Sequence, residues 1–575
     1  MTIRQFLMPL ALGAFGLGLA WGQQYTISTY AGNGTAGFSG DSGAPTSAQL
    51  SSPLGLAIDS SGNLYIVDSV NQRVRKISGG NIMTVAGNGT AGFSGDGKAA
   101  TSAEMLDPAG VALDSSGNIY IADTENHVIR EVTVSNGNIS TIAGNNTGGY
   151  GGDGGAATSA ELEFPTGVAL DASGKLYIAD SGNHLIRQVS GGTINTFAGN
   201  APNFRLHDPE SIVFDSSGNL FISEPNGYKI TKFFNGVLTL VAGNGLIGFS
   251  GDNGPAVDAS FDEPMGIALD ANGYLYVCDT DNNRIRKIAP DGTVTTIAGV
   301  GVPGYGGDGG PATSALLSFP RGIAVDAAFN VYVADTGNNV IRKLQPGTPA
   351  IATGGVVNAA SFTAALSPGA LASIFGSNFA GAGGSAASLP LPPRVGGASV
   401  LVNGVAAPVL YASSSQINFQ IPWEMQPGTA TVMVNSGGMV SNQVNVTIQA
   451  AAPGLFVNGS HAIVQNSDFS LNSSSNPAKA GNTIIAYLTG AGAASPQPAD
   501  GAAAGSEPLS TVSPAPTASI GGTSAMVTFA GLAPGFVGLW QLNIVVPSVT
   551  NAGDLPLVVS AGGQSSNAGN VSVTP

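Results

Sequence analysis

Short apolar runs separated by glycine, asparagine and aspartate turns dominate the first half of the chain. Over residues 264–298 the runs are Gly266–Asp270, Tyr274–Cys278, Arg284–Ile288 and Thr293–Ala298. The turns between them contain Asn272-Gly273, Asp281-Asn282-Asn283 and Asp291-Gly292, residue types that tolerate the positive φ angles of tight hairpins. The pattern therefore predicts a meander of four antiparallel strands.

This unit recurs along the chain. The stretch that begins Pro53-Leu54-Gly55 and ends at Asp68 returns at 108–123, 165–180, 264–279 and 320–335, with a weaker copy at 209–224. The spacing suits radially repeated four-stranded sheets better than the short coils of a solenoid. We therefore expect an all-β fold with a six-bladed β-propeller over residues 23–347.

The two ends of this region complement each other. The fourth-strand pattern, seen for example at Ile82–Gly87 and Val294–Gly299, is missing after Leu344, but residues 25–32 carry it. An open ring would expose two sheet edges. We therefore expect the N-terminal strand to complete the last blade.

The repeat stops near residue 347, and a second duplication follows. Gln416-Ile417-Asn418-Phe419-Gln420-Ile421-Pro422 matches Gln541-Leu542-Asn543-Ile544-Val545-Val546-Pro547 at an offset of 125 residues, and Ser441-Asn442 matches Ser566-Asn567 at the same offset. Alternating runs such as Gln443–Ile448 and Leu555–Ser560 favour strands. These features predict two tandem immunoglobulin-like β-sandwiches, over 348–452 and 453–575.

Composition and charge exclude several classes of protein. Only 9% of the 575 residues are charged and 84 are glycine, which argues against helical bundles. The formal net charge of −16 disfavours nucleic acid as a partner, because affinity for nucleic acid comes largely from Lys and Arg. Residues 1–22 resemble a secretory signal, with Arg4, an apolar core over Phe6–Ala20 and a small-x-small end at Ala20-Trp21-Gly22. A membrane anchor is the alternative, but the apolar stretch is short for a span.

The repeat resembles the NHL family through Pro-x-Gly-Ile-Ala-Leu-Asp, Gly-Asn-Leu-Tyr-Ile-Ala-Asp and Asn-x-x-Ile-Arg-Lys-Ile as they stand in this sequence. This resemblance implies a six-bladed propeller that binds protein, RNA or carbohydrate, with lyases and lactonase-like enzymes as a minority. Pro368–Phe379 resembles the opening of IPT/TIG-type sandwiches, and the whole C-terminal region is similar to one found in exported proteins of soil acidobacteria.

The fourth repeat departs from the others and marks a candidate site. Five repeats are preceded by long loops with a Gly-Asp pair, whereas the fourth has only Asn200–Asp208 there. We expect the long loops to form a rim and the short one to open a gap over the axis. The candidate binding residues, which depart from their repeat equivalents or lie beside the gap, are Glu210, Glu224, Asn226, Arg321 and His207. The competing interpretation is that the fourth repeat has simply decayed.

Metal and cofactor chemistry are not indicated. A single-carboxylate Gly-Asp loop holds calcium poorly, since the ion takes six to eight oxygens, and recurrence in every good repeat points to turn scaffolding. The sequence contains no HExxH and no Gly-x-Ser-x-Gly motif. We therefore expect no cofactor, and predict a secreted or otherwise extracytoplasmic protein, in the periplasm or at the cell surface, that binds a protein or glycan without catalysis. A propeller lyase or lactonase-like hydrolase is the alternative.

Overall fold

The computed structural model describes residues 25–199, 205–380, 384–437, 439–548 and 552–575. The predicted signal segment 1–22 lies outside the described residues. The described chain is all-β apart from ten short 3-10 helices. It forms two compact units, Gln24–Gly347 and Thr348–Pro575.

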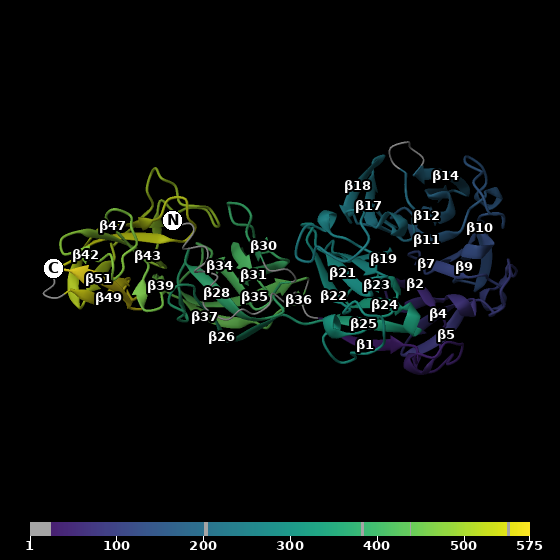
Figure 1. The fold of residues 1–575 in the computed structure, drawn as a ribbon, viewed down its shortest axis with the longest axis horizontal. Helices are drawn as coiled ribbons and strands as arrows, with labels where there is room; N and C mark the ends of the chain where they lie inside the picture. The colour runs from purple at the N-terminus through teal and green to yellow at the C-terminus, as the bar shows by residue number, and fades with distance from the viewer. Residues whose placement is uncertain (1–24, 200–204, 381–383, 438, 549–551) are drawn as a thin grey trace. The chain divides into compact units, whose positions relative to one another are not determined.

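The first unit contains six antiparallel sheets with four main strands each; five are built from consecutive strands, and the sixth combines β23–β25 with the N-terminal β1 (Figure 1). We number the sheets by chain order. Sheets one to three are β2 (Pro53–Ile58), β3 (Leu64–Asp68), β4 (Arg73–Ser78), β5 (Asn81–Ala86); β7 (Pro108–Leu113), β8 (Ile119–Asp123), β9 (Val128–Thr133), β10 (Asn138–Ala143), with the short β6 (Lys98–Ala99) added; and β11 (Pro165–Leu170), β12 (Leu176–Asp180), β13 (Leu185–Ser190), β14 (Thr193–Ala198). Sheets four to six are β15 (Ile212–Phe214), β16 (Leu220–Glu224), β17 (Lys229–Phe234), β18 (Val237–Ala242); β19 (Pro264–Leu269), β20 (Leu275–Asp279), β21 (Arg284–Ile288), β22 (Val294–Ala298); and β23 (Pro320–Val325), β24 (Val331–Asp335), β25 (Val340–Pro346), β1 (Tyr25–Ala31).

Both faces of each sheet are buried against its neighbours. Successive side chains of a strand point to opposite faces, and β20 shows the result. Leu275 and Val277 pack in the core shared with Phe221 of sheet four. Tyr276 packs on the other side, in the core shared with Ile323 of sheet six. This two-sided burial explains why the second strands read as continuous apolar runs.

The first strands of the six sheets form a closed cycle of contacts. β2 contacts β7, β7 contacts β11, β11 contacts β15, β15 contacts β19, β19 contacts β23, and β23 returns to β2. The approach is so close that a Cβ at Gly322 would lie 1.8 Å from the carbonyl oxygen of Leu54. Glycine stands at this position in five of the six first strands for that steric reason: Gly55, Gly110, Gly167, Gly266 and Gly322.

The N-terminal strand completes sheet six, as the sequence predicts. β1 pairs antiparallel with β25, with Tyr25 opposite Pro346 and Ile27 opposite Leu344. Tyr25 and Ile27 are buried. The Tyr25 hydroxyl also accepts a hydrogen bond from Nζ of the buried Lys287 at 3.0 Å, which ties β1 to sheet five.

Two kinds of loop surround the sheets, and both contain short 3-10 helices. The long loops before the first strands hold η1 (Pro45–Ser47), η3 (Ala100–Ser102), η5 (Ala157–Ser159), η8 (Ala256–Asp258) and η9 (Ala312–Ser314). The turns between second and third strands hold η2 (Ser69–Asn71), η4 (Thr124–Asn126), η6 (Ser181–Asn183), η7 (Pro225–Gly227) and η10 (Thr336–Asn338). Sheet five has an ordinary turn in place of the second kind of helix.

The second unit is also built of β-strands. One sheet has the order β26 (Ala350–Asn358), β28 (Leu371–Ser377), β34 (Gln416–Gln420), β33 (Val409–Ala412), β29 (Gly384–Ser385), and a second has β27 (Ala365–Leu366), β37 (Val444–Ile448), β35 (Gly428–Ser436), β31 (Ala398–Val402), β30 (Arg394–Val395), with β32 (Val405–Ala407) and β36 (Met439–Val440) at its side. The third has β38 (Gly454–Leu455), β43 (Thr483–Thr489), β48 (Trp540–Val545), β47 (Thr523–Leu532), β46 (Thr517–Ile520), β49 (Gly553–Ala561), β51 (Gly569–Thr574), β40 (His461–Ala462), β39 (Val457–Asn458), with β41 (Val464–Asn466), β42 (Ala478–Lys479), β44 (Ala494–Ser495), β45 (Thr511–Val512) and β50 (Gln564–Ser565) at its sides.

The duplication predicted in this unit is visible in its hydrogen bonds. Asn442 exchanges hydrogen bonds with the backbone of Ile351, through its Oδ1 at 2.7 Å and its Nδ2 at 3.1 Å. Asn567 does the same with Leu455, at 2.8 and 3.0 Å. Two asparagines at the offset of 125 therefore make the same pair of hydrogen bonds, each with the first strand of its half of the unit.

Candidate functional site

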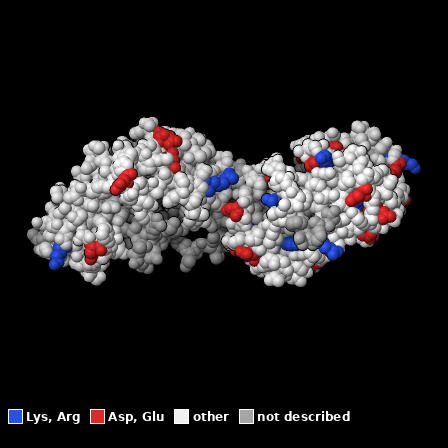
Figure 2. All heavy atoms as spheres, turned by 90° about the horizontal axis from the view of Figure 1, so that it is seen from above, with Lys and Arg blue, Asp and Glu red and all other residues white. Residues whose placement is uncertain are grey.

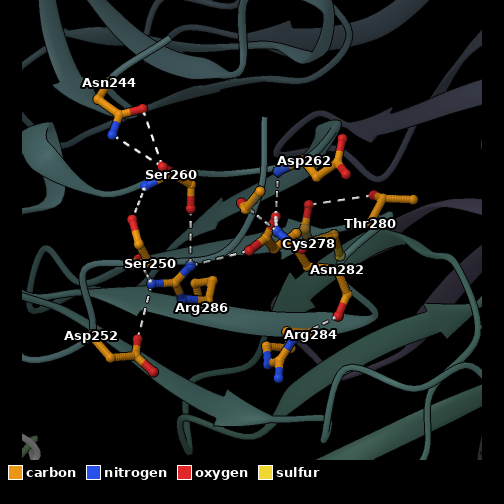
Figure 3. Close-up of polar contacts among 12 residues, drawn as sticks. Asn244, Ser250, Asp252, Ser260, Asp262, Cys278, Thr280, Asn282, Arg284 and Arg286 are labelled. Carbon is orange, nitrogen blue, oxygen red and sulfur yellow. Dashed lines mark hydrogen bonds and ion pairs between the residues drawn. The ribbon is translucent and has the colours of Figure 1, made fainter. Parts of the chain in front are cut away.

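A buried ion-pair network recurs in five of the six sheets, and Figure 3 shows it in sheet five. The fully buried Arg286 donates from Nη1 to Asp279 at 3.1 Å and from Nη2 to Asp252 of the long loop at 2.9 Å. Asp279 also accepts from the backbone of Asp262 and from Asn282. Burial raises the pKa of Asp279 to about 6, although these donors and the Arg286 charge act against the rise.

The same network occurs as Arg75 with Asp68 and Asp41, Arg130 with Asp123 and Asp96, Arg187 with Asp180 and Asp153, and Arg342 with Asp335 and Asp308. The aspartate of each Gly-Asp loop is therefore the outer partner of a buried arginine. This arrangement accounts for the repeated Gly-Asp pairs as loop anchors and agrees with the turn-scaffold interpretation.

Each anchored loop also carries an aromatic ring over its arginine. The guanidinium of Arg130 lies 5.1 Å from the ring centre of Phe93, and that of Arg187 lies 5.1 Å from the ring centre of Tyr150. The rings remain partly exposed: Phe38, Phe93, Tyr150, Phe249 and Tyr305. Because the pattern repeats, it describes the rim of the unit and does not single out one site.

Sheet four replaces the network with a different one. Glu224 stands where the others have aspartate, and Thr231 stands where they have arginine. The Glu224 carboxylate accepts a hydrogen bond from Oγ1 of Thr231 at 2.7 Å and another from the backbone N–H of His207 at 2.9 Å. Nζ of Lys229 lies 3.5 Å from the same carboxylate. Glu224 is fully buried. Its carboxylate is thus engaged by the backbone of His207 and by two side chains of β17.

Two further candidates lie beside Glu224 on the short loop and its neighbour. The side chain of Asn226 donates to Asp208, whose carboxylate also lies 2.6 Å from Nδ1 of His184 in sheet three. His207 is exposed, and its described hydrogen bond is made by the backbone. None of Glu224, Asn226 and His207 lines the cavity on the axis.

That cavity, of about 250 Å³, lies between the first strands of all six sheets. Its wall includes the residue that follows the repeat proline at the start of each sheet: Leu54, Ala109, Thr166, Glu210, Met265 and Arg321. In sheets one, two, three, five and six, the remaining residues of the cavity wall are apolar or glycine. The polarity of the cavity therefore comes from a few positions in sheets three, four and six.

Glu210 and Arg321 are the two charged residues of the described cavity wall. Burial raises the pKa of Glu210 to about 7, while the Arg321 charge lowers it and Asp208 and Glu263 raise it further. The pKa of Glu263 is itself raised by its burial and by the charge of Asp281, while the charge of Arg321 lowers it. Arg321 is exposed. The structure thus brings together two of the five predicted residues at one cavity, a half-buried carboxyl group before the first strand of sheet four and an exposed guanidinium of sheet six.

Sequence reasoning missed two hydroxyl residues of the cavity wall. Ser211 stands in sheet four where the first strands of the other sheets have glycine. Its Oγ accepts a hydrogen bond from the backbone N–H of Ile267 at 3.3 Å. The hydroxyl of Thr166 donates to the backbone carbonyl of Glu210 at 3.0 Å and lies 2.6 Å from Oγ of Ser181. Both residues depart from the repeat, so the comparison that found Glu210 could also have found them.

The described residues contain no cluster of three or more His, Cys, Asp and Glu side chains with the geometry of a metal site. Cys278 is fully buried, and burial raises the pKa of its thiol well above the usual range. Among these same residues no helix has the length and apolar character needed to cross a membrane.

Comparison with known proteins identifies the repeat. The family model described as "NHL repeat" matches residues 50–77, 105–130, 162–189 and 261–288. The first unit thus contains NHL repeats, and the repeated four-stranded sheets agree with a propeller. Sheets four and six both lie outside the four matched segments.

The curated relatives are similar over about half of this chain. Protein SUPPRESSOR OF QUENCHING 1, chloroplastic, of Arabidopsis thaliana is 31% identical over 321 residues, which cover 51% of this chain and 30% of that protein. Human Teneurin-4 is 26% identical over 342 residues, 51% of this chain and 10% of that protein. The chain therefore spans less than a third of the length of these two relatives.

Among solved structures, an auxiliary nutrient binding protein from Bacteroides thetaiotaomicron aligns with a TM-score of 0.44 and 18% identity. The alignment covers 56% of this chain and 76% of that chain. A likeness of this size does not identify the ligand of the present protein.

Proposed function

We propose that residues 25–347 form a six-bladed NHL propeller that binds a small polar group in its axial cavity, without catalysis. The observation that carries the proposal is the position of Glu210 and Arg321. They are charged, they lie at equivalent places in two sheets, and they face a cavity whose other equivalent positions hold Leu54, Ala109, Thr166 and Met265. Departures from a repeat that converge on one cavity are more specific than departures scattered over the surface.

The terminal sugar of a glycan fits this site better than a protein segment. Ligand pockets usually measure about 300–1,000 Å³, and the cavity of about 250 Å³ admits only a small group. A carboxylate, a guanidinium and the hydroxyls of Thr166 and Ser211 offer both donors and acceptors to sugar hydroxyls. Figure 2 shows few charged side chains on the face that it presents, and only 9% of all residues are charged. The alternative ligand is a protein, which would bind to the rim formed by the long loops.

A glycan array probed with the full-length protein lacking residues 1–22 would identify ligands, and calorimetric titration of each hit would test the site. We expect Glu210→Gln and Arg321→Met each to weaken binding at least tenfold. Leu54→Met, a change at the equivalent position of sheet one, is the matched control and should bind like the wild type. Wild-type affinity in both charge variants would refute the proposal.

One observation favours an enzyme as the second candidate, a lyase or lactonase-like hydrolase. A carboxyl group with a pKa of about 7 in a cavity suits a general base. Turnover of a lactone or of an array ligand, abolished by Glu210→Gln at unchanged binding, would support it. Elemental analysis of the purified protein would show whether a metal accompanies that activity.

We also propose that the protein is exported and acts in the periplasm or at the cell surface, and that residues 348–452 and 453–575 are two IPT/TIG-like, immunoglobulin-like sandwiches of the acidobacterial type. Support for the sandwiches comes from the duplicated hydrogen bonds of Asn442 and Asn567. Fractionation of the native host and the processed N-terminus would test export. Separate expression of 348–452 would test the boundary.

A further inference from the structure

Hydrogen bonds from the turn between the second and third strands fasten most sheets of the first unit to the next sheet. We call the contact between two successive sheets a seam. In the seam from sheet two to sheet three, Oγ1 of Thr124 donates to the carbonyl oxygen of Pro165 at 2.8 Å. In the same seam the backbone N–H of Phe164 donates to Nδ1 of His127 at 3.2 Å. Both bonds hold the chain where the first strand of sheet three begins.

These two bonds recur around the cycle of sheets. A hydroxyl group donates to the proline carbonyl of the following sheet in three further seams, through Ser181, Thr280 and Thr336. A side-chain acceptor binds the backbone N–H before that proline in four further seams, through Gln72, His184, Asn283 and Asn339. Even the seam from sheet six back to sheet one, which joins the two ends of the unit, has both bonds, at 2.7 and 2.9 Å.

The seam from sheet four to sheet five has neither bond. Pro225 stands at the hydroxyl position, and Tyr228 stands at the acceptor position. Proline has no hydroxyl to donate, and among the described residues no hydrogen bond joins the Tyr228 side chain to Glu263, which precedes the proline of sheet five. The seam from sheet three to sheet four keeps both bonds. Residues 200–204, which the structure does not describe, belong to the sequence before sheet four.

The same seam also lacks the close approach of backbones at the axis. In the other five seams a glycine of one first strand faces a carbonyl oxygen of the next sheet, and a Cβ added to that glycine would lie between 1.8 and 2.5 Å from the oxygen. Ser211 occupies this position in sheet four and carries a Cβ. Sheets four and five therefore cannot approach each other at the axis as closely as the other pairs do. A hydrogen bond of 3.3 Å from the backbone N–H of Ile267 to Oγ of Ser211 joins their first strands instead.

We propose that the first unit opens at the seam between sheets four and five, and that this opening widens the axial cavity beside Glu210. Three kinds of fastening found at the other seams are absent from this one, which retains its apolar core. Local opening occurs where few interactions must break together. Glu210 and Ser211 on one side of the seam and Met265 on the other line the cavity. The opening stands independently of the proposed function, whereas its use as a route for the ligand rests on that function.

A variant that supplies the missing bonds tests the proposal. Pro225→Thr combined with Tyr228→Asn, here the bonded variant, gives sheet four the residues found at Thr280 and Asn283 of sheet five. Tyr228 already has a φ of 49°, which asparagine tolerates, so we expect the turn to be retained. Tyr228→Gly is the matched control, because glycine adopts the same backbone and offers no acceptor.

Hydrogen exchange followed by mass spectrometry measures the opening in the protein lacking residues 1–22. The first strands β19, β7 and β23 each have six residues, and β19 borders the seam. In the wild type the amides of β19 should exchange at least tenfold faster than those of β7. The bonded variant should slow exchange in β19 at least tenfold, and Tyr228→Gly should leave it unchanged. Conversely, Thr280→Val combined with Asn283→Ala should speed exchange in β23 at least tenfold.

The widening of the cavity is measured by the labelling of a single cysteine in its wall. Met265→Cys borders the seam, and Ala109→Cys is the control at the equivalent place in sheet two. The natural Cys278 is fully buried. The rate of labelling by fluorescein maleimide, divided by the rate with the small reagent iodoacetamide, should fall at least tenfold at position 265 when the bonded variant is introduced. At position 109 it should not change.

Exchange in β19 that is no faster than in β7, or that stays the same in the bonded variant, would overturn the proposal. An equal effect of Tyr228→Gly would assign the change to the turn backbone and would also overturn it. Labelling at position 265 that ignores the added bonds would contradict the widening. If the bonded variant does not fold, unchanged exchange in β23 after the loss of its two bonds would still refute the role of these bonds. None of these measurements uses a ligand, so the binding site at Glu210 and Arg321 is tested separately.

Discussion

Replacing Arg286 by methionine removes the centre of the buried network in sheet five while keeping a long side chain in its place. The guanidinium makes contacts of 3.1 Å to Asp279, 2.9 Å to Asp252 and 2.9 Å to the carbonyl of Ser250. Removing one member of a buried ion pair costs about 3–5 kcal/mol, because the remaining charge stays buried. Asp279 keeps two donors, the backbone of Asp262 and the side chain of Asn282, so we expect the lower part of that range.

The matched comparison is Asp252→Asn, which removes only the outer carboxylate of the same arginine. The Asp252 side chain is 31% exposed, and partly exposed pairs contribute about 1 kcal/mol or less. Urea unfolding followed by far-UV circular dichroism would measure both variants. Trp423 and Trp540 lie in the second unit, so tryptophan fluorescence recorded in parallel would follow that unit.

The pH dependence gives a second readout of the same change. The pKa of Asp279 is about 6 in the folded chain, above its ordinary 3.8, so the stability associated with its protonated form is present below about pH 4 and lost as pH rises through 6. The charge of Arg286 lowers the pKa of Asp279. In Arg286→Met that pKa should therefore be higher, and the stability lost between low and high pH should be larger. The variant should therefore differ from the wild type more at pH 8 than at pH 4.5. A cost below about 1 kcal/mol at pH 8, or a gap independent of pH, would refute this reasoning.

Three further changes test the ring and its cavity. Deleting residues 25–31 should lower the free energy of unfolding of the first unit by at least about 4 kcal/mol, since it exposes the edge of β25 and removes the buried Tyr25 and Ile27; an unchanged thermal melt would contradict closure by β1. Gly322→Ala places a Cβ 1.8 Å from the Leu54 carbonyl oxygen and should cost about 3 kcal/mol in urea unfolding, whereas Ser211→Ala, at a position that already carries a Cβ, should cost about 1 kcal/mol. Glu210→Gln should match the wild type near pH 4.5 and be more stable at pH 8, by at most about 3 kcal/mol. The reason is that the wild type loses stability as pH rises from 4.5 through the Glu210 pKa of about 7. Equal pH profiles of stability in the two proteins would contradict a raised pKa at Glu210.

The repeat made the strands of the first unit predictable. Tight-turn residues and continuous apolar runs indicated four strands per unit, and the missing fourth strand after Leu344 located the partner of β1. The C-terminal duplication could also be recognised in the sequence. Its Ser441-Asn442 and Ser566-Asn567 pairs make matching hydrogen bonds in the structure. Regular positions are readable since one steric or hydrogen-bonding demand is repeated in each copy.

The site was less predictable, because contacts between distant residues are not visible in a repeat pattern. Glu210 and Arg321 were chosen as departures, and they do face one cavity. Glu224 departs equally, yet it is a buried partner of Thr231, a compensation for the arginine that sheet four lacks. The arginine itself recurs seven residues after each aspartate, but only the structure shows that it is buried and linked to the Gly-Asp loop.

Restoring the repeat at the axis separates the site from the scaffold. The triple variant Glu210→Leu, Ser211→Gly and Arg321→Leu gives sheets four and six the residues found at Leu54 and Gly55 in sheet one. Calorimetric titration of the variant with the glycan that the wild type binds should give no measurable heat, while its melting temperature stays equal to or above that of the wild type. Retained affinity in a folded variant would show that the ligand binds elsewhere.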